Sequence, residues 1–257
     1  MAPAMMLPTL HQFRFSHYNE KARWALDHKR VAHRRRSYLP GMHVLPIRRL
    51  TGQQQVPVLV DGERIIPGSA AIVEYLETAH PEPALLPADP AVRQQVLEVQ
   101  RYFDAQIGGP LRAAAFQEWL TDTRYMSRLF ATHAGPLARG AYSAAFPLIR
   151  VAMRATMRLG PEAAAEGLRR GAEGFAFVAD RAGPSGYLVS DRFTLADLTA
   201  AAILAPAIMP PEFPYTPPQP IAPAVQAFLD RWRDHPGAAW VREMYRRHRD
   251  PSAAIDD

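Results

Sequence analysis

The stretch from 56 to 72 constrains the fold of this chain more than any other. It begins with a short β-branched run, Val56-Pro57-Val58-Leu59-Val60. Proline cannot donate a hydrogen bond to a strand ladder, so we expect Pro57 at the first residue of a strand or at a bend. X-Pro bonds are the ones that adopt the cis form at low cost. A cis Pro57 would turn Val56 outward and leave its N–H and C=O free to pair with an extended ligand.

The rest of this stretch predicts a turn and then a helix. Asp61-Gly62 is a two-residue hairpin signal. Ser69 can cap the N–H groups of a helix, and apolar residues follow it at helical spacing. Strand, turn, strand and helix N-terminus form a frame that can hold a small anionic, peptide-like molecule through backbone bonds and the helix dipole.

The first 80 residues read as an α/β domain. Alternating aromatic residues predict a strand at 9–15, and Ser16 is a candidate N-cap for a helix to about Lys29. A second strand is expected at 34–39 and a short helical turn at 46–50. This order predicts a mixed sheet with helices on its faces.

The rest of the chain predicts helices. A proline-rich linker is expected at 81–90, an all-helical bundle domain at 91–250 and a flexible tail at 251–257. No convincing strand is predicted after the linker. A stiff loop is expected at 206–223, because its prolines exclude a helix or a central strand.

One helix of the second domain has two interpretations. In 142–159, Arg150, Arg154 and Arg158 recur every four residues and share one face. The arginines either contact a membrane surface or an anionic ligand, or face water on a partly exposed helix. We favour the solvated helix. A capping-box pattern at Thr194–Asp197 predicts the start of the buried helix of this domain.

Composition excludes several classes of function. The chain of 257 residues has no cysteine, which rules out disulfides, thiolate metal sites and cysteine redox chemistry from the protein itself. Its histidines lack metal-ligand spacing, so no metal site is expected. The net charge of +5 comes with no nucleic-acid-binding motif. No signal peptide or spanning helix is recognised, and we expect a cytoplasmic protein.

Three stretches resemble the glutathione S-transferase superfamily, whose first half is a thioredoxin-like domain. They bracket most of the chain in the order of that family. The residues are Phe15-Ser16-His17-Tyr18-Asn19-Glu20-Lys21-Ala22-Arg23-Trp24-Ala25-Leu26, then Gln55-Val56-Pro57-Val58-Leu59 with Ser69-Ala70-Ala71-Ile72-Val73-Glu74-Tyr75-Leu76, and Asp191-Arg192-Phe193-Thr194-Leu195-Ala196-Asp197.

This resemblance, which is to bacterial members with serine at the catalytic position, implies a role for Ser16. A thiol with a pKa near 8.5 is mostly protonated at neutral pH, and only the thiolate attacks. A hydroxyl that donates to sulfur at a helix N-terminus would stabilise the thiolate. The alternative is that Ser16 is a plain N-cap. Tyr18 is a rival hydroxyl donor, His17 either contacts the ligand or faces solvent, and Asn19 stands where thioredoxin-like relatives place a second cysteine.

The resemblance also implies the residues that bind glutathione. Val56 would bond its cysteinyl backbone, with Pro57 holding that geometry in cis. Ser69 would bind the γ-glutamyl carboxylate, and Gln55 the glycyl end. Gly68 departs from the family, which usually has an acidic residue there to pair with the γ-glutamyl ammonium. Losing such a charged partner costs about 1.5–3 kcal/mol.

The sequence therefore supports two functions. The first is a glutathione S-transferase-like enzyme that activates a thiol cosubstrate for attack on a hydrophobic electrophile, typically in detoxification; the cosubstrate is glutathione or, given Gly68, another thiol. The second is a non-catalytic protein of the same fold that binds an apolar ligand or a partner. The family analogy implies a homodimer.

Overall fold

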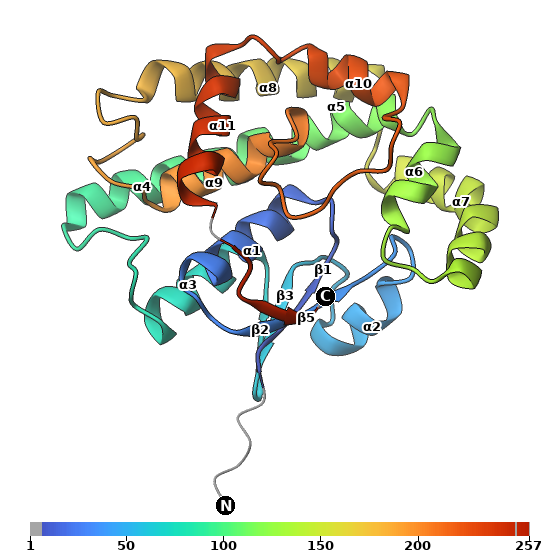
Figure 1. Cartoon of the computed structure of the whole chain (residues 1–257), viewed down its shortest axis with the longest axis horizontal. Helices are drawn as coiled ribbons and strands as arrows, with labels where there is room; N and C mark the ends of the chain where they lie inside the picture. Colours follow the sequence, from blue (N-terminus) through green and yellow to red (C-terminus); the bar gives the residue numbers. More distant parts are fainter. Residues whose placement is uncertain (1–6, 250, 257) are drawn as a thin grey trace, which may run out of the picture. The chain divides into compact units, whose positions relative to one another are not determined.

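The chain folds into two units, and its last residues return to the first of them. The computed structural model describes residues 7–249 and 251–256 (Figure 1). One unit comprises residues 1–85 with 249–257, and the other comprises 86–248. The first is a mixed α/β domain and the second is helical, as the sequence predicts.

A five-stranded sheet forms the centre of the first unit. Its order is β4-β3-β1-β2-β5. β1 is parallel to β2 and antiparallel to β3, while β3 is antiparallel to β4 and β2 is parallel to β5. The strands are β1 (Thr9–Gln12), β2 (His33–Ser37), β3 (Val58–Asp61), β4 (Arg64–Pro67) and β5 (Ala254–Asp256).

Three helices cover this sheet. They are α1 (His17–His28), α2 (Val44–Thr51) and α3 (Ser69–Ala79). Figure 1 shows α1 and α3 on one face and α2 on the other. The apolar side chains of Trp24 and Leu26 on α1 and of Ile72 and Val73 on α3 are fully buried. Their burial fixes both helices against the strands.

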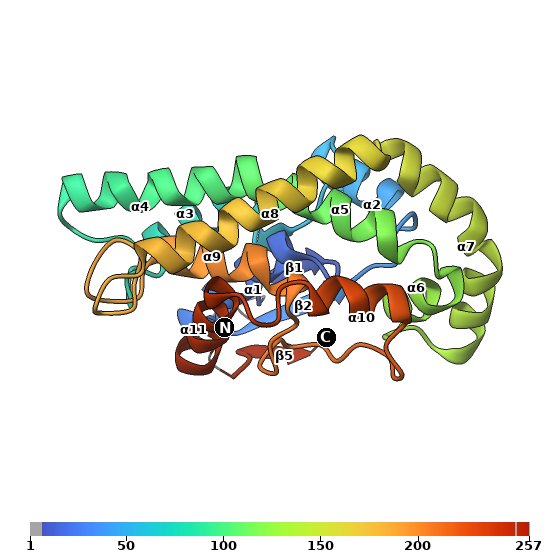
Figure 2. The ribbon, with the colours of Figure 1, turned by 90° about the horizontal axis from the view of Figure 1, so that it is seen from above.

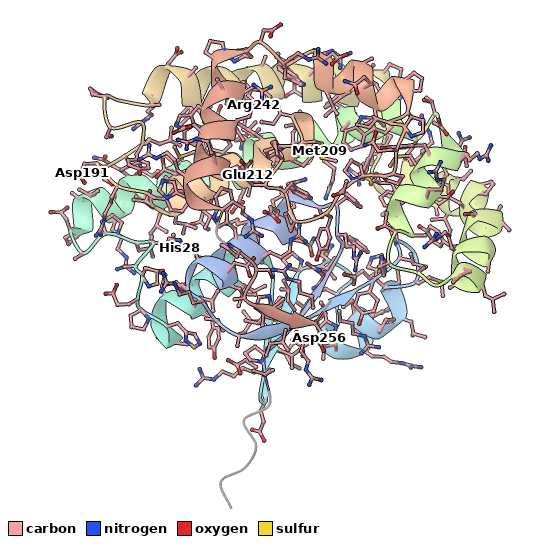
Figure 3. The ribbon with its side chains drawn as sticks, viewed as in Figure 1. His28, Asp191, Met209, Glu212, Arg242 and Asp256 are labelled. Carbon is pink, nitrogen blue, oxygen red and sulfur yellow. The ribbon has the colours of Figure 1, made fainter. Side chains whose placement is uncertain are left out.

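The C-terminal strand corrects the prediction of a flexible tail at 251–257. Ala254–Asp256 pairs with β2, with His33 opposite Ala254. Without it, β2 would be an edge strand with unpaired backbone groups. The Ala253 N–H also donates to the Asp27 carboxylate at 2.8 Å, which fixes the approach of the tail. In Figure 3, Asp256 is labelled at this edge of the sheet.

The second unit is formed from helices. α4, a π-helical turn (Phe103–Gly108) and α5 follow one another directly, so the helical stretch from 90 to 119 contains a local distortion at 103–108. The helices are α4 (Pro90–Tyr102), α5 (Gly109–Trp119), α6 (Thr123–Phe130), α7 (Pro136–Thr156), α8 (Pro161–Arg181), α9 (Leu195–Leu204), α10 (Pro223–Asp230) and α11 (Pro236–His248).

The buried centre of this unit is α9, as predicted from its apolar run. Every residue of α9 is buried. Its capping box is complete: Asp197 accepts hydrogen bonds from the Thr194 N–H at 2.9 Å and the Leu188 N–H at 2.8 Å. The carboxylate therefore joins the preceding loop to the start of the central helix.

α5 and α8 approach each other closely (Figure 2). Gly167 on α8 allows this, because a Cβ there would lie 2.2 Å from the Pro110 carbonyl oxygen. Only a residue without a side chain fits such a contact.

The structure decides only in part between the two interpretations of Arg150, Arg154 and Arg158. α7 ends at Thr156, so Arg158 lies beyond the helix that was expected over 142–159 and does not share its face. Arg150 donates to the Leu120 carbonyl at 3.2 Å and Arg154 to the Gln117 side chain at 2.9 Å. These two guanidinium groups are thus occupied within the unit and do not simply face water, whereas Arg158 is exposed. No helix among residues 7–249 and 251–256 is long and apolar enough to cross a membrane.

The proline-rich segment agrees with its prediction. After a 3₁₀ turn at Ala205–Ala207 the backbone is irregular until α10 begins at Pro223. Phe213 and Tyr215 in this segment are nevertheless buried. Figure 3 labels Met209 and Glu212 there.

Candidate functional site

The predicted site residues lie on three loops at one end of the sheet. β1 runs antiparallel to β3, with His11 opposite Val58. β3 runs antiparallel to β4, with Val58 opposite Pro67. The β1–α1, α2–β3 and β4–α3 loops therefore leave the sheet at the same end. These loops carry Ser16, Val56 with Pro57, and Gly68, respectively, and Ser69 follows Gly68 as the first residue of α3.

Ser16 is the N-cap of α1, but its side chain does not cap the helix. Its backbone is extended and its carbonyl accepts from the Glu20 N–H at 2.8 Å. The Oγ instead accepts a hydrogen bond from Asn19 Nδ2 at 2.7 Å. The plain N-cap interpretation of the Ser16 hydroxyl is therefore wrong.

Asn19 determines which way the Ser16 hydroxyl can donate. Its Oδ1 accepts from the Phe13 N–H at 3.2 Å, so its amide nitrogen must face Ser16. Ser16 Oγ is thus an acceptor in this pair. Its own proton has no acceptor among the described residues and remains available to another group.

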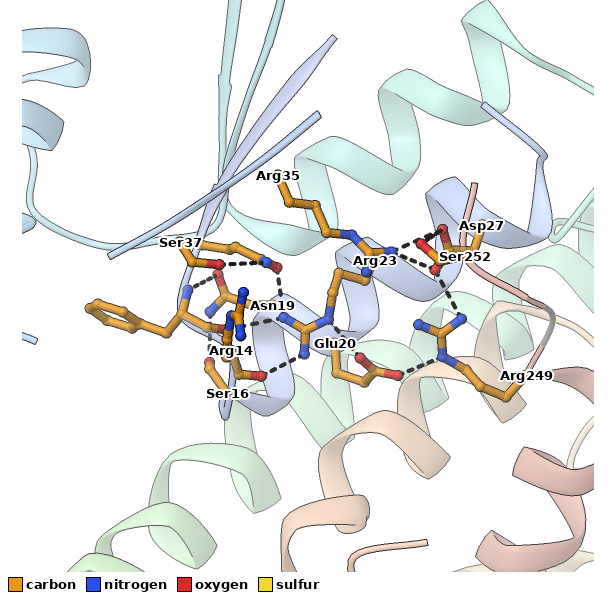
Figure 4. Close-up of polar contacts among 12 residues, drawn as sticks. Arg14, Ser16, Asn19, Glu20, Arg23, Asp27, Arg35, Ser37, Arg249 and Ser252 are labelled. Atoms are coloured by element: carbon orange, nitrogen blue, oxygen red, sulfur yellow. Dashed lines mark hydrogen bonds and ion pairs between the residues drawn. The ribbon is translucent and has the colours of Figure 1, made fainter. Parts of the chain in front are cut away.

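Arg23 braces the loop that ends at Ser16 (Figure 4). Its guanidinium donates to the carbonyls of Phe13 at 3.1 Å and Arg14 at 3.0 Å, and to Gln12 Oε1 at 2.7 Å. Its Nε pairs with Glu20 at 2.8 Å, and both side chains are fully buried. The loop geometry is therefore set by charge-assisted hydrogen bonds from inside the domain.

Val56 and Pro57 are arranged as the sequence predicts. The Val56–Pro57 peptide bond is cis. Among the described residues, no hydrogen bond to the Val56 N–H or C=O is found. Val56 is partly exposed. Pro57 itself is buried, and its carbonyl accepts from the Gly68 N–H at 2.9 Å. That bond joins the Val56 edge to the start of α3.

Gly68, and not Ser69, is the N-cap of α3, which corrects the prediction of a serine cap. Gly68 has φ +94°, a conformation that favours glycine, and Ser69 is the first residue of the helix. In the described structure the Ser69 hydroxyl and the first N–H groups of α3 have no protein partner. A helix N-terminus with such groups suits a carboxylate.

The remaining predicted residues differ in their surroundings. Gln55 is exposed, and its backbone is held by Gln53, whose Nε2 donates to the Gln55 carbonyl at 2.9 Å. His17 is 4% exposed, and its ring centroid lies 4.2 Å from that of Tyr18, which is partly buried. His17 therefore does not face solvent.

Burial lowers the pKa of three histidines of this domain, His11, His33 and His43. His11 on β1 shares a hydrogen bond of 2.8 Å with the Tyr38 hydroxyl, and burial with nearby Arg36 lowers its pKa to about 4. His43, whose ring contacts that of Phe13, also has its pKa lowered by burial. Within the described ranges, no cluster of His, Asp and Glu could hold a metal ion.

Sequence reasoning missed Glu20, Arg23 and Arg249. Glu20 and Arg23 lie within a recognised helix, but a buried ion pair has no signature that separates it from exposed helix charges. Arg249 follows the last helix and was expected to precede a frayed end. Its guanidinium is buried, with contacts to Glu20 at 2.7 Å and Asp27 at 2.9 Å.

Comparison with known families matches both halves of the chain. Residues 10–84 match the model of the glutathione S-transferase N-terminal domain, and residues 143–236 match that of the C-terminal domain. The chain belongs to the glutathione S-transferase superfamily. The three loops described above are thus in the domain that binds glutathione in that superfamily.

Two curated relatives share short segments with this superfamily member. A probable maleylacetoacetate isomerase of Vibrio cholerae is 43% identical over 54 residues, which is 21% of this chain and 25% of that protein. A maleylpyruvate isomerase of a Ralstonia species is 51% identical over 47 residues, 18% of this chain and 22% of that protein. The matched segments thus span about a quarter of the relatives' length.

Solved structures resemble the whole chain. A glutathione S-transferase from Rhodospirillum rubrum has a TM-score of 0.60 at 21% identity, covering 95% of this chain and 90% of that one. The β-etherase LigF from a Sphingobium species also has a TM-score of 0.60 at 21% identity, covering 93% and 99%. A theta-class transferase from Xanthomonas axonopodis with glutathione bound has 0.56 at 20%, covering 97% and 100%. This likeness shows the fold.

Proposed function

We propose that this protein is a glutathione-dependent enzyme that activates the thiol of glutathione for attack on a hydrophobic electrophile. The observation that carries the proposal is the Ser16 hydroxyl. Asn19 Nδ2 donates to the Ser16 oxygen, and the Ser16 proton, at the N-terminus of α1, has no acceptor among the described residues. A donor in that position stabilises a thiolate more than a thiol.

The other two loops supply what binding would need. In the described part of the chain the Val56 N–H and C=O are unpaired, and these are the two groups with which an extended peptide backbone pairs. Ser69 and the free N–H groups of α3 would hold the γ-glutamyl carboxylate. Gln55 is exposed and would reach the glycyl end.

The chemistry assigned to the protein is modest. The thiol proton leaves to solvent, and the Ser16 O–H and the α1 dipole lower the energy of the thiolate that remains. The sulfur then forms a bond to an electrophilic carbon. A leaving group departs in a transfer, whereas glutathione departs again in an isomerisation like those named for the two curated relatives. We propose a homodimer in the cytoplasm as its working form.

Substitution of Ser16 tests this proposal. Ser16→Ala should lower kcat by about 10²-fold or more, because the lost hydrogen bond strengthens as negative charge develops on sulfur. The affinity for glutathione should change less than threefold, since Val56 and Ser69 are intact. Equal losses of kcat and affinity, or no loss of either, would contradict a role in activation.

A second function is favoured by one observation. Gly68 provides no carboxylate for the γ-glutamyl ammonium. The protein would then be a non-catalytic binder of the same fold. Retention on immobilised glutathione, together with conjugation of a nitro-activated aryl chloride, separates the two. A protein that shows neither retention nor turnover would be the binder.

A further inference from the structure

A group of buried charges joins the C-terminal segment to α1. It comprises the carboxylates of Glu20 and Asp27 and the guanidinium groups of Arg23, Arg35 and Arg249, all with side chains no more than 3% exposed. Figure 4 shows them between the Ser16 loop and the C-terminal segment. Charges this deeply buried persist only when each is paired.

The group has two parts: Glu20 with Arg23, next to the Ser16 loop, form the inner half, and Asp27 with Arg35 form the outer half. Arg23 belongs to the inner half, since it holds the carbonyls of Phe13 and Arg14 directly before Ser16. Arg35 belongs to the outer half, where it donates to both oxygens of Asp27, at 3.0 and 2.8 Å. Within the described residues, Arg35 makes no hydrogen bond or ion pair with Glu20 or Arg23.

Arg249 connects the two halves. Its Nε donates to Glu20 Oε1 at 2.7 Å, while its Nη1 pairs with Asp27 Oδ2 at 2.9 Å. The other Glu20 oxygen, Oε2, accepts from Arg23 Nε at 2.8 Å. The two oxygens of Glu20 are thus bound by two different arginines, which together orient the carboxylate. Its position in turn orients the Arg23 fork.

We propose that Arg249 is a positioning residue of the thiol-activating site, which it reaches through Glu20 and Arg23; this rests on the function proposed for Ser16. The C-terminal segment 249–256 is then a working part of the N-terminal domain. The sequence of contacts is Arg249 to Glu20, Glu20 to Arg23, and Arg23 to the two carbonyls of the loop that ends at Ser16.

Loss of Arg249 should act on the site in a specific way. Glu20 would lose the guanidinium at its Oε1 and rotate, and Arg23 would follow, because its Nε bond to Glu20 is one of the contacts that orient its fork. The carbonyls of Phe13 and Arg14 would shift, and the Ser16 Oγ with them. Donation to sulfur depends steeply on distance and angle, whereas the binding groups on the other two loops are untouched.

The test compares Arg249→Gln with the matched control Arg35→Gln. Both remove a buried guanidinium that pairs with Asp27, so both should lower the melting temperature. The readout is the pKa of the thiol of bound glutathione, which is measured by titrating the ultraviolet absorbance of the thiolate. Arg249→Gln should decrease the acid dissociation constant of the bound thiol by about two- to tenfold, while Arg35→Gln leaves that constant unchanged. The dissociation constant of glutathione should change less than twofold in both.

Hydrogen exchange of the 13–16 backbone gives a readout that needs no glutathione. Exchange should accelerate in Arg249→Gln and not in Arg35→Gln. Equal effects of the two substitutions, or none from Arg249→Gln, would overturn the proposal. If the unsubstituted protein does not bind glutathione, the proposed function fails by itself, and the exchange data still decide whether Arg249 holds the loop.

A milder variant guards against misfolding. Arg249→Lys keeps the charge but cannot bind Glu20 and Asp27 together through a planar fork. If Arg249→Gln is insoluble, Arg249→Lys should show the same selective changes in thiol pKa and loop exchange. A folded Arg249→Lys protein with both unchanged would overturn the proposal.

Discussion

Substitution of Asp27 by asparagine should be among the most destabilising single changes of side-chain charge in the N-terminal domain. The Asp27 side chain is fully buried and accepts from Arg35 at 2.8 Å, Arg249 at 2.9 Å and the Ala253 N–H at 2.8 Å. An asparagine side chain there would have the same shape but a single acceptor oxygen. Its amide nitrogen would face donors.

The size of the effect follows from these contacts. Removing one partner of a buried ion pair costs about 3–5 kcal/mol, because the other charges remain buried without compensation. Two guanidinium groups lose an anionic partner here, so we expect the upper part of that range. A domain with about 5–15 kcal/mol of total stability would keep only a fraction of it.

Asp256→Asn is the matched control. Asp256 also joins the C-terminal segment to the sheet, through Arg34 at 3.7 Å, but the two side chains are 56% and 60% exposed. Such a pair contributes about 0–1 kcal/mol. The two substitutions remove the same charge from the same domain and differ in burial.

Hydrogen exchange of α1 at increasing urea concentration measures the stability of this domain separately from the helical one. Asp27→Asn should lower the free energy of opening of α1 by several kcal/mol and remove protection from 253–256. A cost below about 1 kcal/mol, or one equal to that of Asp256→Asn, would refute the assignment of this charge group as a structural centre.

Three further predictions concern other parts of the chain. Gly68→Asp should improve glutathione affinity by about tenfold, or 1.4 kcal/mol, because the carboxylate gives the γ-glutamyl ammonium a partner. The space around Gly68 is open, but φ +94° strains any L-residue, so the melting temperature should fall. Unchanged or weaker glutathione binding measured by calorimetry would contradict this prediction. Asp197→Ala should cost about 2–4 kcal/mol in urea unfolding, because the Leu188 and Thr194 N–H groups lose their acceptor; a cost under 0.5 kcal/mol would be inconsistent with the capping box. The pKa of His11 is lowered from 6.5 to about 4, so between these pH values the unfolded chain binds a proton that the native protein does not. The stability that neutral His11 contributes is therefore present at neutral pH and is lost as pH falls from about 6.5 to 4. His11→Gln should reduce that loss by about 1–3 kcal/mol, and identical profiles of stability against pH for the two proteins would disprove the prediction.

The parts of the fold that the sequence predicts well are those set by local rules. The hairpin between β3 and β4, the strand that begins after Pro57 and the capping box at Thr194 each depend on residues a few positions apart. The two loop residues of the hairpin are Gly62 and Glu63, one position later than the predicted Asp61-Gly62, because Asp61 pairs with Arg64. The apolar period of α9 likewise predicts a buried helix. These patterns determine local structure almost independently of the rest of the chain.

The parts that were missed depend on contacts between distant residues. β5 is short and has no strand-like composition, and it forms because β2 offers an unpaired edge and Asp27 accepts from Ala253. Asp27 and Ala253 are 226 positions apart. The same holds for Arg249, whose partners lie on α1. No local pattern at 249–256 distinguishes such a segment from a frayed end.

The candidate site falls between these cases. The residues around Val56 and Pro57 are recognised from the sequence because a proline beside a β-branched run is confined to the first residue of a strand or to a bend. The role proposed for the Ser16 hydroxyl rests on the side-chain geometry, since a serine before a helix is most often a cap. Here Asn19, which the sequence marks only by its spacing, donates from Nδ2 to Ser16 Oγ.

The pKa of the thiol of bound glutathione is the measurement that tests the central claim most directly. Titration of the thiolate absorbance should give a value at least about one unit below the 8.5 typical of a free thiol, and Ser16→Ala should return it close to that value while glutathione remains bound. A thiol whose pKa is the same in both proteins would show that the Ser16 hydroxyl does not stabilise the thiolate.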